Sequence, residues 1–176
     1  RECVRESLVL LKNSNHVLPL KKNLKHIVVL GRAADDLGIQ CGGWTIDWQG
    51  RTGNVTTGGT TLLTAIKQVV GPETEVSFSP AGGDLKAADA VIVVVGEEPY
   101  AEMKGDRQEL SLTPADLALI ARAKTASAPV VTALYSGRPL ILGSAMTDSD
   151  SLVAAWLPGT EGKGIEEVEV DGGFPP

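Results

Sequence analysis

The sequence predicts an α/β fold, specifically a three-layer αβα sandwich in which a mainly parallel sheet of five or six strands carries helices on both faces. Two observations lead to this prediction. Short segments rich in β-branched residues alternate along the chain with segments of helical periodicity, as in consecutive β-α-β units. The segment 90–95 is apolar at every position, which is typical of a strand covered on both faces.

The expected strands and helices follow from local patterns. A helix is expected within 59–70, where apolar residues recur every three or four positions before Gly71-Pro72. A second is expected over 112–126, where Thr113 precedes a proline suited to the first helical turn. Residues 1–12 are expected to form a helical turn or two and then a short extended piece. Strands are expected at 26–30, 75–78, 90–95, 130–135 and 152–157.

The length of 176 residues is that of a single domain. We divide it into an opening segment 1–25, a core 26–165 and an atypical acidic tail 166–176. The chain starts without methionine, so we expect it to be a piece of a longer protein.

Composition excludes several classes of partner and cofactor. A net charge of −6 argues against nucleic acid, which requires clustered Lys and Arg. No apolar run approaches the roughly 20 residues that span a membrane. Phosphate-binding glycine motifs and His-Cys clusters are absent from the sequence, so neither cofactor nor metal is expected.

Cys3 and Cys41 are expected to be small buried residues, with a single bridge between them as the alternative. His16 and His26 accompany no Ser or Cys nucleophile motif. We expect Asp35-Asp36 to cap the turn that follows.

Two long loops are expected at one edge of the sheet, over 31–58 and 96–111. Loops longer than about 12–15 residues are usually functional or disordered, and neither of these has a disordered composition. In an open parallel sheet, ligands bind beyond the carboxyl ends of the strands. The functional residues are therefore expected in these loops.

Each loop has a functional and a purely structural interpretation. The second loop holds five carboxylates within 13 residues, and a carboxylate beside an aromatic surface can serve as a general acid. Composition alone favours a solvated acidic loop. The first loop carries Trp44 and Trp48, whose flat faces suit sugar rings. The alternative is that both tryptophans only cover the edge of the sheet.

Five ordered motifs together resemble the second domain of glycoside hydrolase family 3, the β-glucosidases and β-glucan exohydrolases. The resemblance covers residues 1 to about 165. The motifs are Arg5–Asn13 with Leu18-Pro19-Leu20, Gly42–Gly50, Gly96–Arg107, Ser136–Pro139, and Ala154–Gly159 with Glu161-Gly162.

The resemblance implies retaining hydrolysis by two carboxylates about 5 Å apart. In the family the nucleophile is an aspartate on a preceding (β/α)8-type barrel domain, which this chain does not contain. The acid/base comes from the loop matching Tyr100-Ala101-Glu102, so Glu102 is the expected acid/base. Glu97, Glu98 and Glu109 compete with it, and Glu98 most seriously.

The resemblance also assigns the aromatic residues and the partners. Trp48 matches the tryptophan that, with one from the barrel, sandwiches the sugar in the +1 subsite. Trp44 is then expected to support its loop, and Asp106 and Arg107 to fix the acidic loop by local pairing. The expected partners are a β-glucoside or β-glucan oligosaccharide and the barrel domain. Relatives are commonly secreted or periplasmic.

The expected function is the acid/base domain of a retaining exo-acting β-glucosidase or β-glucan glucohydrolase, inactive without its barrel. A stand-alone carbohydrate-binding module and an inactive fragment of such an enzyme are the alternatives. After Gly164 the sequence departs from the family, which usually has a more apolar helix there. The last helix is therefore expected to be frayed, displaced or absent.

Overall fold

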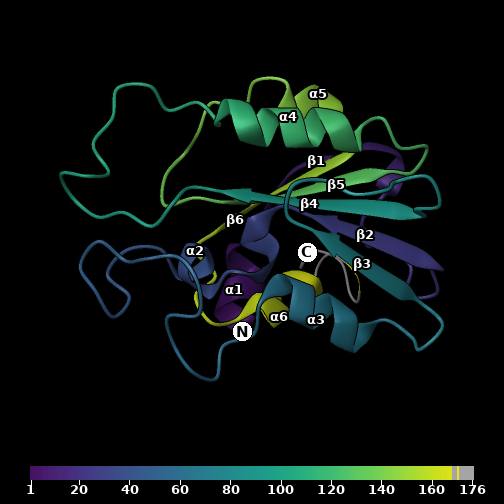
Figure 1. The fold of residues 1–176 in the computed structure, drawn as a ribbon, viewed down its shortest axis with the longest axis horizontal. Helices are drawn as coiled ribbons and strands as arrows, with labels where there is room; N and C mark the ends of the chain where they lie inside the picture. The colour runs from purple at the N-terminus through teal and green to yellow at the C-terminus, as the bar shows by residue number, and fades with distance from the viewer. Residues whose placement is uncertain (168–169, 171–176) are drawn as a thin grey trace.

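A mostly parallel sheet forms the centre of the molecule (Figure 1). The computed structural model describes residues 1–167 and 170, and within them the sheet has six strands in the order β1-β6-β5-β4-β2-β3. All neighbouring strands are parallel except β1, which runs antiparallel to β6. The strands are β1 (Val9–Asn13), β2 (His26–Leu30), β3 (Glu75–Ser79), β4 (Ala90–Gly96), β5 (Val130–Tyr135) and β6 (Ser151–Trp156).

Helices cover both faces of this sheet, so the predicted αβα sandwich is confirmed. One layer contains α1 (Glu2–Ser7), α3 (Leu62–Val69) and α6 (Gly162–Glu166), and the other contains α4 (Pro114–Ala123) and α5 (Ala145–Asp148) (Figure 1). None of the helices that the structure describes is long and apolar enough to cross a membrane.

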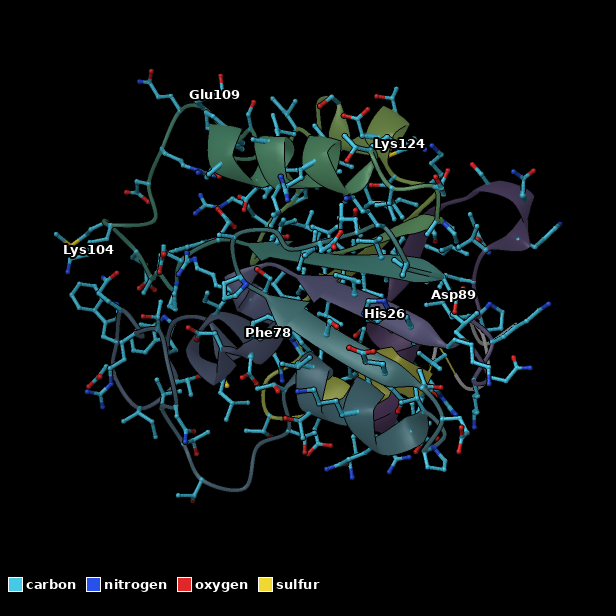
Figure 2. The ribbon with its side chains drawn as sticks, turned by 45° about the vertical axis from the view of Figure 1, so that its right-hand side comes forward. His26, Phe78, Asp89, Lys104, Glu109 and Lys124 are labelled. Carbon is cyan, nitrogen blue, oxygen red and sulfur yellow. The ribbon has the colours of Figure 1, made fainter. Side chains whose placement is uncertain are left out.

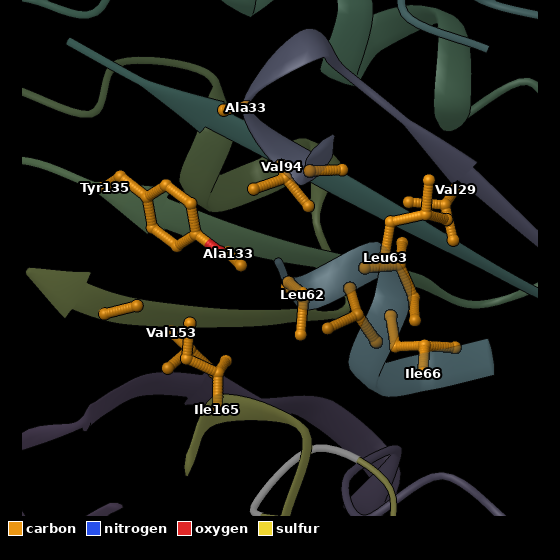
Figure 3. Close-up of a cluster of buried hydrophobic side chains, with 14 of the residues drawn as sticks. Val29, Ala33, Leu62, Leu63, Ile66, Val94, Ala133, Tyr135, Val153 and Ile165 are labelled. Carbon is orange, nitrogen blue, oxygen red and sulfur yellow. The ribbon is translucent and has the colours of Figure 1, made fainter. Parts of the chain in front are cut away.

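Strand β4 shows why its sequence is apolar throughout. Ile92 and Val94 belong to the hydrophobic cluster under α3, whereas Val91, Val93 and Val95 belong to the cluster under α4. Successive side chains of a strand point to opposite faces, so a strand covered on both sides needs apolar residues at every position. Figure 3 shows part of the first cluster, in which residues of α3 pack against the strands.

The two predicted helices begin at hydroxyl caps. Thr61 Oγ1 accepts a hydrogen bond from the Thr64 amide at 3.2 Å, and Thr113 Oγ1 accepts one from the Asp116 amide at 3.1 Å. These bonds satisfy amides that have no partner within the first helical turn. Both helices lie inside the predicted ranges and are shorter than them.

The opening segment contributes to the sheet. After α1 the chain forms β1, which pairs with β6 in the register Val9 opposite Ala154, followed by a short 3₁₀ turn, η1 (Ser14–His16). Helix α1 packs on α6 so closely that a Cβ on Gly164 would lie 2.8 Å from the Arg1 carbonyl oxygen. Helix α6 is formed and packed, so the prediction that the last helix is frayed, displaced or absent is wrong as far as Glu166. Most of the acidic tail predicted at 166–176 lies outside the described residues.

The long loop predicted over 31–58 begins with two short helical elements, η2 (Arg32–Asp35) and α2 (Leu37–Cys41). Four or five residues cannot show a helical period, which is why the sequence pattern did not indicate them. Asp36 caps α2, as predicted, by accepting the Ile39 amide at 2.9 Å, and it also accepts the Gly53 amide at 2.8 Å.

The prediction for the cysteines was half wrong. Cys41 is buried, and burial raises the pKa of its thiol. Cys3 is exposed, because α1 presents no buried residue. Both cysteines are free thiols, so the alternative of a bridge between them is wrong.

Candidate active site

Two loops meet beyond the carboxyl ends of β2 and β4, at the edge where the functional residues were expected. We call residues 42–50 the tryptophan loop and residues 97–111 the acid loop. Their backbones touch, because a Cβ on Gly43 would lie 2.0 Å from the Tyr100 carbonyl oxygen. Figure 2 shows Lys104 and Glu109 at this end of the molecule, and His26 and Asp89 where β2 and β4 begin.

Trp48 and Glu102 are in direct contact across the two loops. The indole Nε1 of Trp48 donates a hydrogen bond to Oε2 of Glu102 at 2.7 Å. This bond is the main reason that the pKa of Glu102 lies below its usual range, and Trp44 makes a smaller contribution in the same direction. A donor that faces a carboxylate favours its charged form. In this chain Glu102 is therefore held as a carboxylate.

Gln49, beside Trp48, binds the backbone of the acid loop. Its Nε2 donates to the Glu102 carbonyl oxygen at 3.0 Å, and its Oε1 accepts from the Ala101 amide at 3.0 Å. Sequence reasoning did not single out Gln49. Its position next to Trp48 was the available signal, but a glutamine in a loop has no spacing that identifies its partner.

Trp44 closes the tryptophan loop through its backbone and leaves its ring exposed. Its amide donates to the Trp48 carbonyl at 2.9 Å, and the two indoles lie 6.3 Å apart at 52°. Trp44 is 68% exposed and Trp48 is 45% exposed. Ile46, Met103 and Leu157 are also exposed. Exposed apolar residues mark an interaction site where they form one large contiguous patch, whereas single ones are common on protein surfaces.

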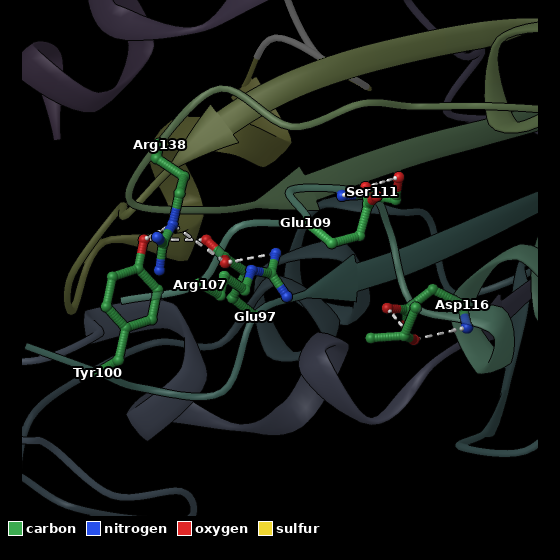
Figure 4. Close-up of polar contacts among 8 residues, drawn as sticks. Glu97, Tyr100, Arg107, Glu109, Ser111, Asp116 and Arg138 are labelled. Atoms are coloured by element: carbon green, nitrogen blue, oxygen red, sulfur yellow. Dashed lines mark hydrogen bonds and ion pairs between the residues drawn. The ribbon is translucent and has the colours of Figure 1, made fainter. Parts of the chain in front are cut away.

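Glu97 is engaged in a cluster at the base of the acid loop (Figure 4). Its carboxylate pairs with Arg107 at 3.0 Å and with Arg138 at 3.3 Å, and it accepts the Tyr100 hydroxyl at 3.0 Å. Arg138 Nε donates to the Tyr100 oxygen at 2.7 Å, and its guanidinium lies 4.0 Å from the centre of the Tyr100 ring. A carboxylate occupied by these three groups fits a structural role better than proton donation.

The other two competing acids also have partners outside the tryptophan loop. Glu98 forms an exposed ion pair with Arg32, and Glu109 accepts the Ser111 amide at 3.0 Å at the far end of the acid loop. Of the four acidic candidates, Glu102 is the one whose carboxylate receives a hydrogen bond from the tryptophan loop.

Asp106 and Arg107 make different contacts. Arg107 forms an ion pair with Glu97 within the acid loop, and its role as loop support stays a prediction. Asp106 is exposed, and its amide donates to the Met103 carbonyl at 3.2 Å. Within the described part of the chain, its carboxylate makes no hydrogen bond or ion pair. Its role as loop support stays a prediction.

A cleft of about 290 Å³ lies between the two loops, and Trp44 and Glu102 are among the residues that line it. Leu157, which follows β6, also lines it. A second cleft of about 380 Å³ lies against the acid loop and is lined by Arg32, Lys104 and Arg107. Residues 1–167 and 170 contain no group of His, Cys, Asp and Glu side chains that could hold a metal ion.

Comparison with known proteins gives the family. A family model described as the glycosyl hydrolase family 3 C-terminal domain matches residues 8–168. A lysosomal beta glucosidase of Dictyostelium discoideum is 33% identical over 89% of this chain and 22% of its own length. A periplasmic beta-glucosidase of Salmonella typhimurium is 28% identical over 92% of this chain and 25% of its own length.

Solved structures agree in fold. The exo-1,3/1,4-beta-glucanase of a Pseudoalteromonas species has a TM-score of 0.90 and 40% identity over 96% of this chain and 22% of its own. A beta-glucosidase of Listeria innocua has a TM-score of 0.79 and 27% identity over 96% of this chain and 24% of its own. The chain thus spans about a quarter of the relatives it matches. It belongs to glycosyl hydrolase family 3, and it corresponds to the C-terminal domain of that family.

Proposed function

We propose that this chain supplies the general acid/base and a sugar-binding surface to the active site of a retaining exo-acting β-glucosidase or β-glucan glucohydrolase. The observation that supports this best is the 2.7 Å hydrogen bond between Trp48 and Glu102. It brings a carboxylate and an exposed aromatic face together beside a cleft. The nucleophile comes from a (β/α)8-type barrel domain, and we call the polypeptide that joins barrel and chain the full-length enzyme.

In the first step, Glu102 gives its proton to the glycosidic oxygen as the bond to the leaving group breaks. The aspartate of the barrel attacks the anomeric carbon at the same time and forms a covalent glycosyl-enzyme. In the second step, the Glu102 carboxylate removes a proton from the water that displaces the aspartate. The two carboxyl groups need to stand about 5 Å apart.

Glu102 has to acquire the proton that it gives away. In this chain the Trp48 indole lowers the pKa of Glu102, which opposes an acid role. A second carboxylate nearby and the exclusion of water by a substrate both raise the pKa of a carboxyl group. The proposal therefore makes Glu102 an effective acid only in the assembled site, and the chain alone is expected to lack turnover.

The exposed indoles supply the sugar-binding surface. Trp48 is 45% exposed although its N–H is engaged with Glu102, so a face of the ring is free to contact a sugar ring. A sugar stacked on Trp48 lies beside the proton donor. This fits the +1 subsite, where the leaving group resides.

Hydrolysis by the full-length enzyme tests this proposal. Replacement of Glu102 by Gln is expected to lower kcat/KM for a β-glucan oligosaccharide by about 10²- to 10⁴-fold, the usual contribution of general acid catalysis. Dinitrophenyl β-glucoside should retain more activity in its glycosylation step, because its leaving group needs no proton. Glu109→Gln is the control and should remain close to wild type. Equal losses on both substrates, or no loss, would argue against the assignment.

A stand-alone carbohydrate-binding module is the second candidate function. Exposure of Trp44 and Trp48 on one loop favours it. The chain alone would then bind β-glucan oligosaccharides measurably, for example by titration calorimetry. Trp48→Ala would abolish binding, whereas Glu102→Gln would leave it intact. A chain that binds no glucan and fails to unfold cooperatively on heating would instead behave as an inactive fragment.

A further inference from the structure

We propose that Gln49 is a positioning residue that holds the Glu102 backbone in place and, through the adjacent Trp48, aligns the Glu102 carboxylate. The consequence for catalysis rests on the proposed function, but the geometric claim does not. The side-chain amide of Gln49 uses both of its ends on the acid loop, accepting from the Ala101 amide and donating to the Glu102 carbonyl, each at 3.0 Å. It thereby bridges the backbone groups of two consecutive residues of the acid loop.

The acid loop needs this support because Glu102 sits on a tight, exposed turn. The Gly105 amide donates to the Ala101 carbonyl at 2.9 Å, and Met103 has a left-handed φ of 73°. Ala101 is buried, whereas the Glu102 side chain is exposed. Packing therefore does not immobilise the Glu102 side chain, and its position depends on hydrogen bonds.

Two consecutive residues of the tryptophan loop contact the side chain and the backbone of Glu102. Trp48 holds the carboxylate at 2.7 Å and Gln49 holds the carbonyl at 3.0 Å. A movement at Gln49 therefore displaces the acid loop relative to the indole. On the other side, Tyr100 is fixed by Arg138 at 2.7 Å. Gln49 is thus the residue that joins the backbone of the acid loop to the tryptophan loop, beside the bond that Trp48 makes to the carboxylate.

Small displacements at such a site are costly for catalysis. A misplacement of about 1 Å can lower the rate about 10²-fold even when it originates away from the reacting atoms. Loss of the Gln49 contacts should therefore reduce proton transfer more than binding. This separates a positioning role from a contribution to substrate affinity.

Two substitutions remove the contacts in different ways. Gln49→Met keeps the length of the side chain and loses both hydrogen bonds. Gln49→Glu keeps an acceptor for the Ala101 amide and places a second acceptor against the Glu102 carbonyl. Gln108→Glu is the matched control, because it adds the same charge to an exposed position of the acid loop. Thermal unfolding of each variant shows whether it folds. If Gln49→Met does not fold, Gln49→Glu is used to test the proposal.

The first readout uses the 176-residue chain and does not depend on activity. The indole N–H resonance of Trp48 is followed by ¹H–¹⁵N NMR as the pH is lowered, and in the wild type it should report the titration of Glu102. In both Gln49 variants the shift amplitude should fall by at least half and the midpoint should rise. Gln108→Glu should match the wild type. An unchanged Trp48 titration in a folded Gln49→Met variant would overturn the proposal.

The second readout is kinetic and uses the full-length enzyme. Gln49→Met should lower kcat on a β-glucan oligosaccharide by at least tenfold with little change in KM, and should affect the dinitrophenyl glucoside much less. If Glu102→Gln is unimpaired, the proposed function fails. If Glu102→Gln is impaired but Gln49→Met is not, the positioning role alone fails.

Discussion

The indole Nε1 of Trp48 lies 2.7 Å from Oε2 of Glu102, across 54 positions of sequence. Together with the hydrogen bonds of Gln49, this bond joins the two loops that leave the carboxyl ends of neighbouring parallel strands, β2 and β4. A ligand that stacks on the indole is placed beside the carboxylate. The proposed function places its acid/base and its leaving-group subsite in this relationship.

Replacing Trp48 by Phe should lower the free energy of unfolding relative to wild type, and this loss should be larger at neutral pH than in acid. The Trp48 N–H lowers the pKa of Glu102 in the folded chain. The ionised carboxylate therefore stabilises the fold at pH values above its unfolded pKa, and this contribution disappears as the pH falls through the lowered value. Urea unfolding from pH 7 down to about pH 3 spans the ordinary carboxyl pKa and measures the difference.

Trp156→Phe is the matched control for that experiment. The Trp156 indole donates to the Ser7 carbonyl at 3.1 Å, so its removal costs a hydrogen bond that involves no titrating group. The difference between this variant and wild type should not depend on pH. A pH-independent difference for Trp48→Phe as well would contradict the coupling of the indole to Glu102.

Glu97→Gln should destabilise the chain by about 1.5–3 kcal/mol, the usual range for hydrogen bonds to charged groups. Glu97 receives Arg107, Arg138 and the Tyr100 hydroxyl, and its side chain is only 10% exposed. The substitution leaves two guanidinium groups without their carboxylate. Urea unfolding at pH 7 measures the loss.

Glu98→Gln provides the comparison for Glu97. The ion pair of Glu98 with Arg32 is exposed on both sides, and such pairs contribute about 0–1 kcal/mol. The two variants should therefore differ clearly in their unfolding midpoints. Equal losses would mean that the cluster around Glu97 does not stabilise the acid loop.

Gly43→Ala should separate the two loops. The added Cβ would lie 2.0 Å from the Tyr100 carbonyl oxygen, which is backbone and cannot move alone. We expect a stability loss of about 1–3 kcal/mol, as for other overpacked sites, together with loss of the Trp48 indole shift on Glu102 titration.

Gly71→Ala is the corresponding control. A Cβ on Gly71 would meet nothing within 4 Å, and its φ lies outside the left-handed region. It should change the free energy of unfolding by no more than about 0.5 kcal/mol, as most surface substitutions do. An unchanged Trp48 signal in Gly43→Ala would show that the loops tolerate separation.

The strands could be predicted from the sequence because burial on both faces leaves a strong local signal. Each of the five predicted strands lies within one residue of its expected bounds. The placement of the two loops at one edge followed from parallel topology, since β2 and β4 end at the same side of the sheet. The start of α4 followed from Thr113 and the proline after it, whereas the cap of α3 at Thr61 was not singled out in the predicted range 59–70.

Contacts between distant residues could not be predicted in the same way. Arg138 reaches Tyr100 across 38 positions and Gln49 reaches the Glu102 carbonyl across 53, and neither pair has a local periodicity. Helix α2 is too short to show one. The assignment of Glu102 came from a family resemblance, and the geometry adds the partner that distinguishes it from Glu97, Glu98 and Glu109.

The most direct test of the central claim is the product that a Glu102→Ala full-length enzyme forms from dinitrophenyl β-glucoside in the presence of azide. In a retaining enzyme without its acid/base, the glycosyl-enzyme accumulates, and azide displaces the barrel aspartate without needing a base. We predict faster turnover with azide and a glucosyl azide of β configuration. No azide product from this variant, or azide rescue of Glu97→Ala or Glu98→Ala instead, would contradict the assignment of Glu102.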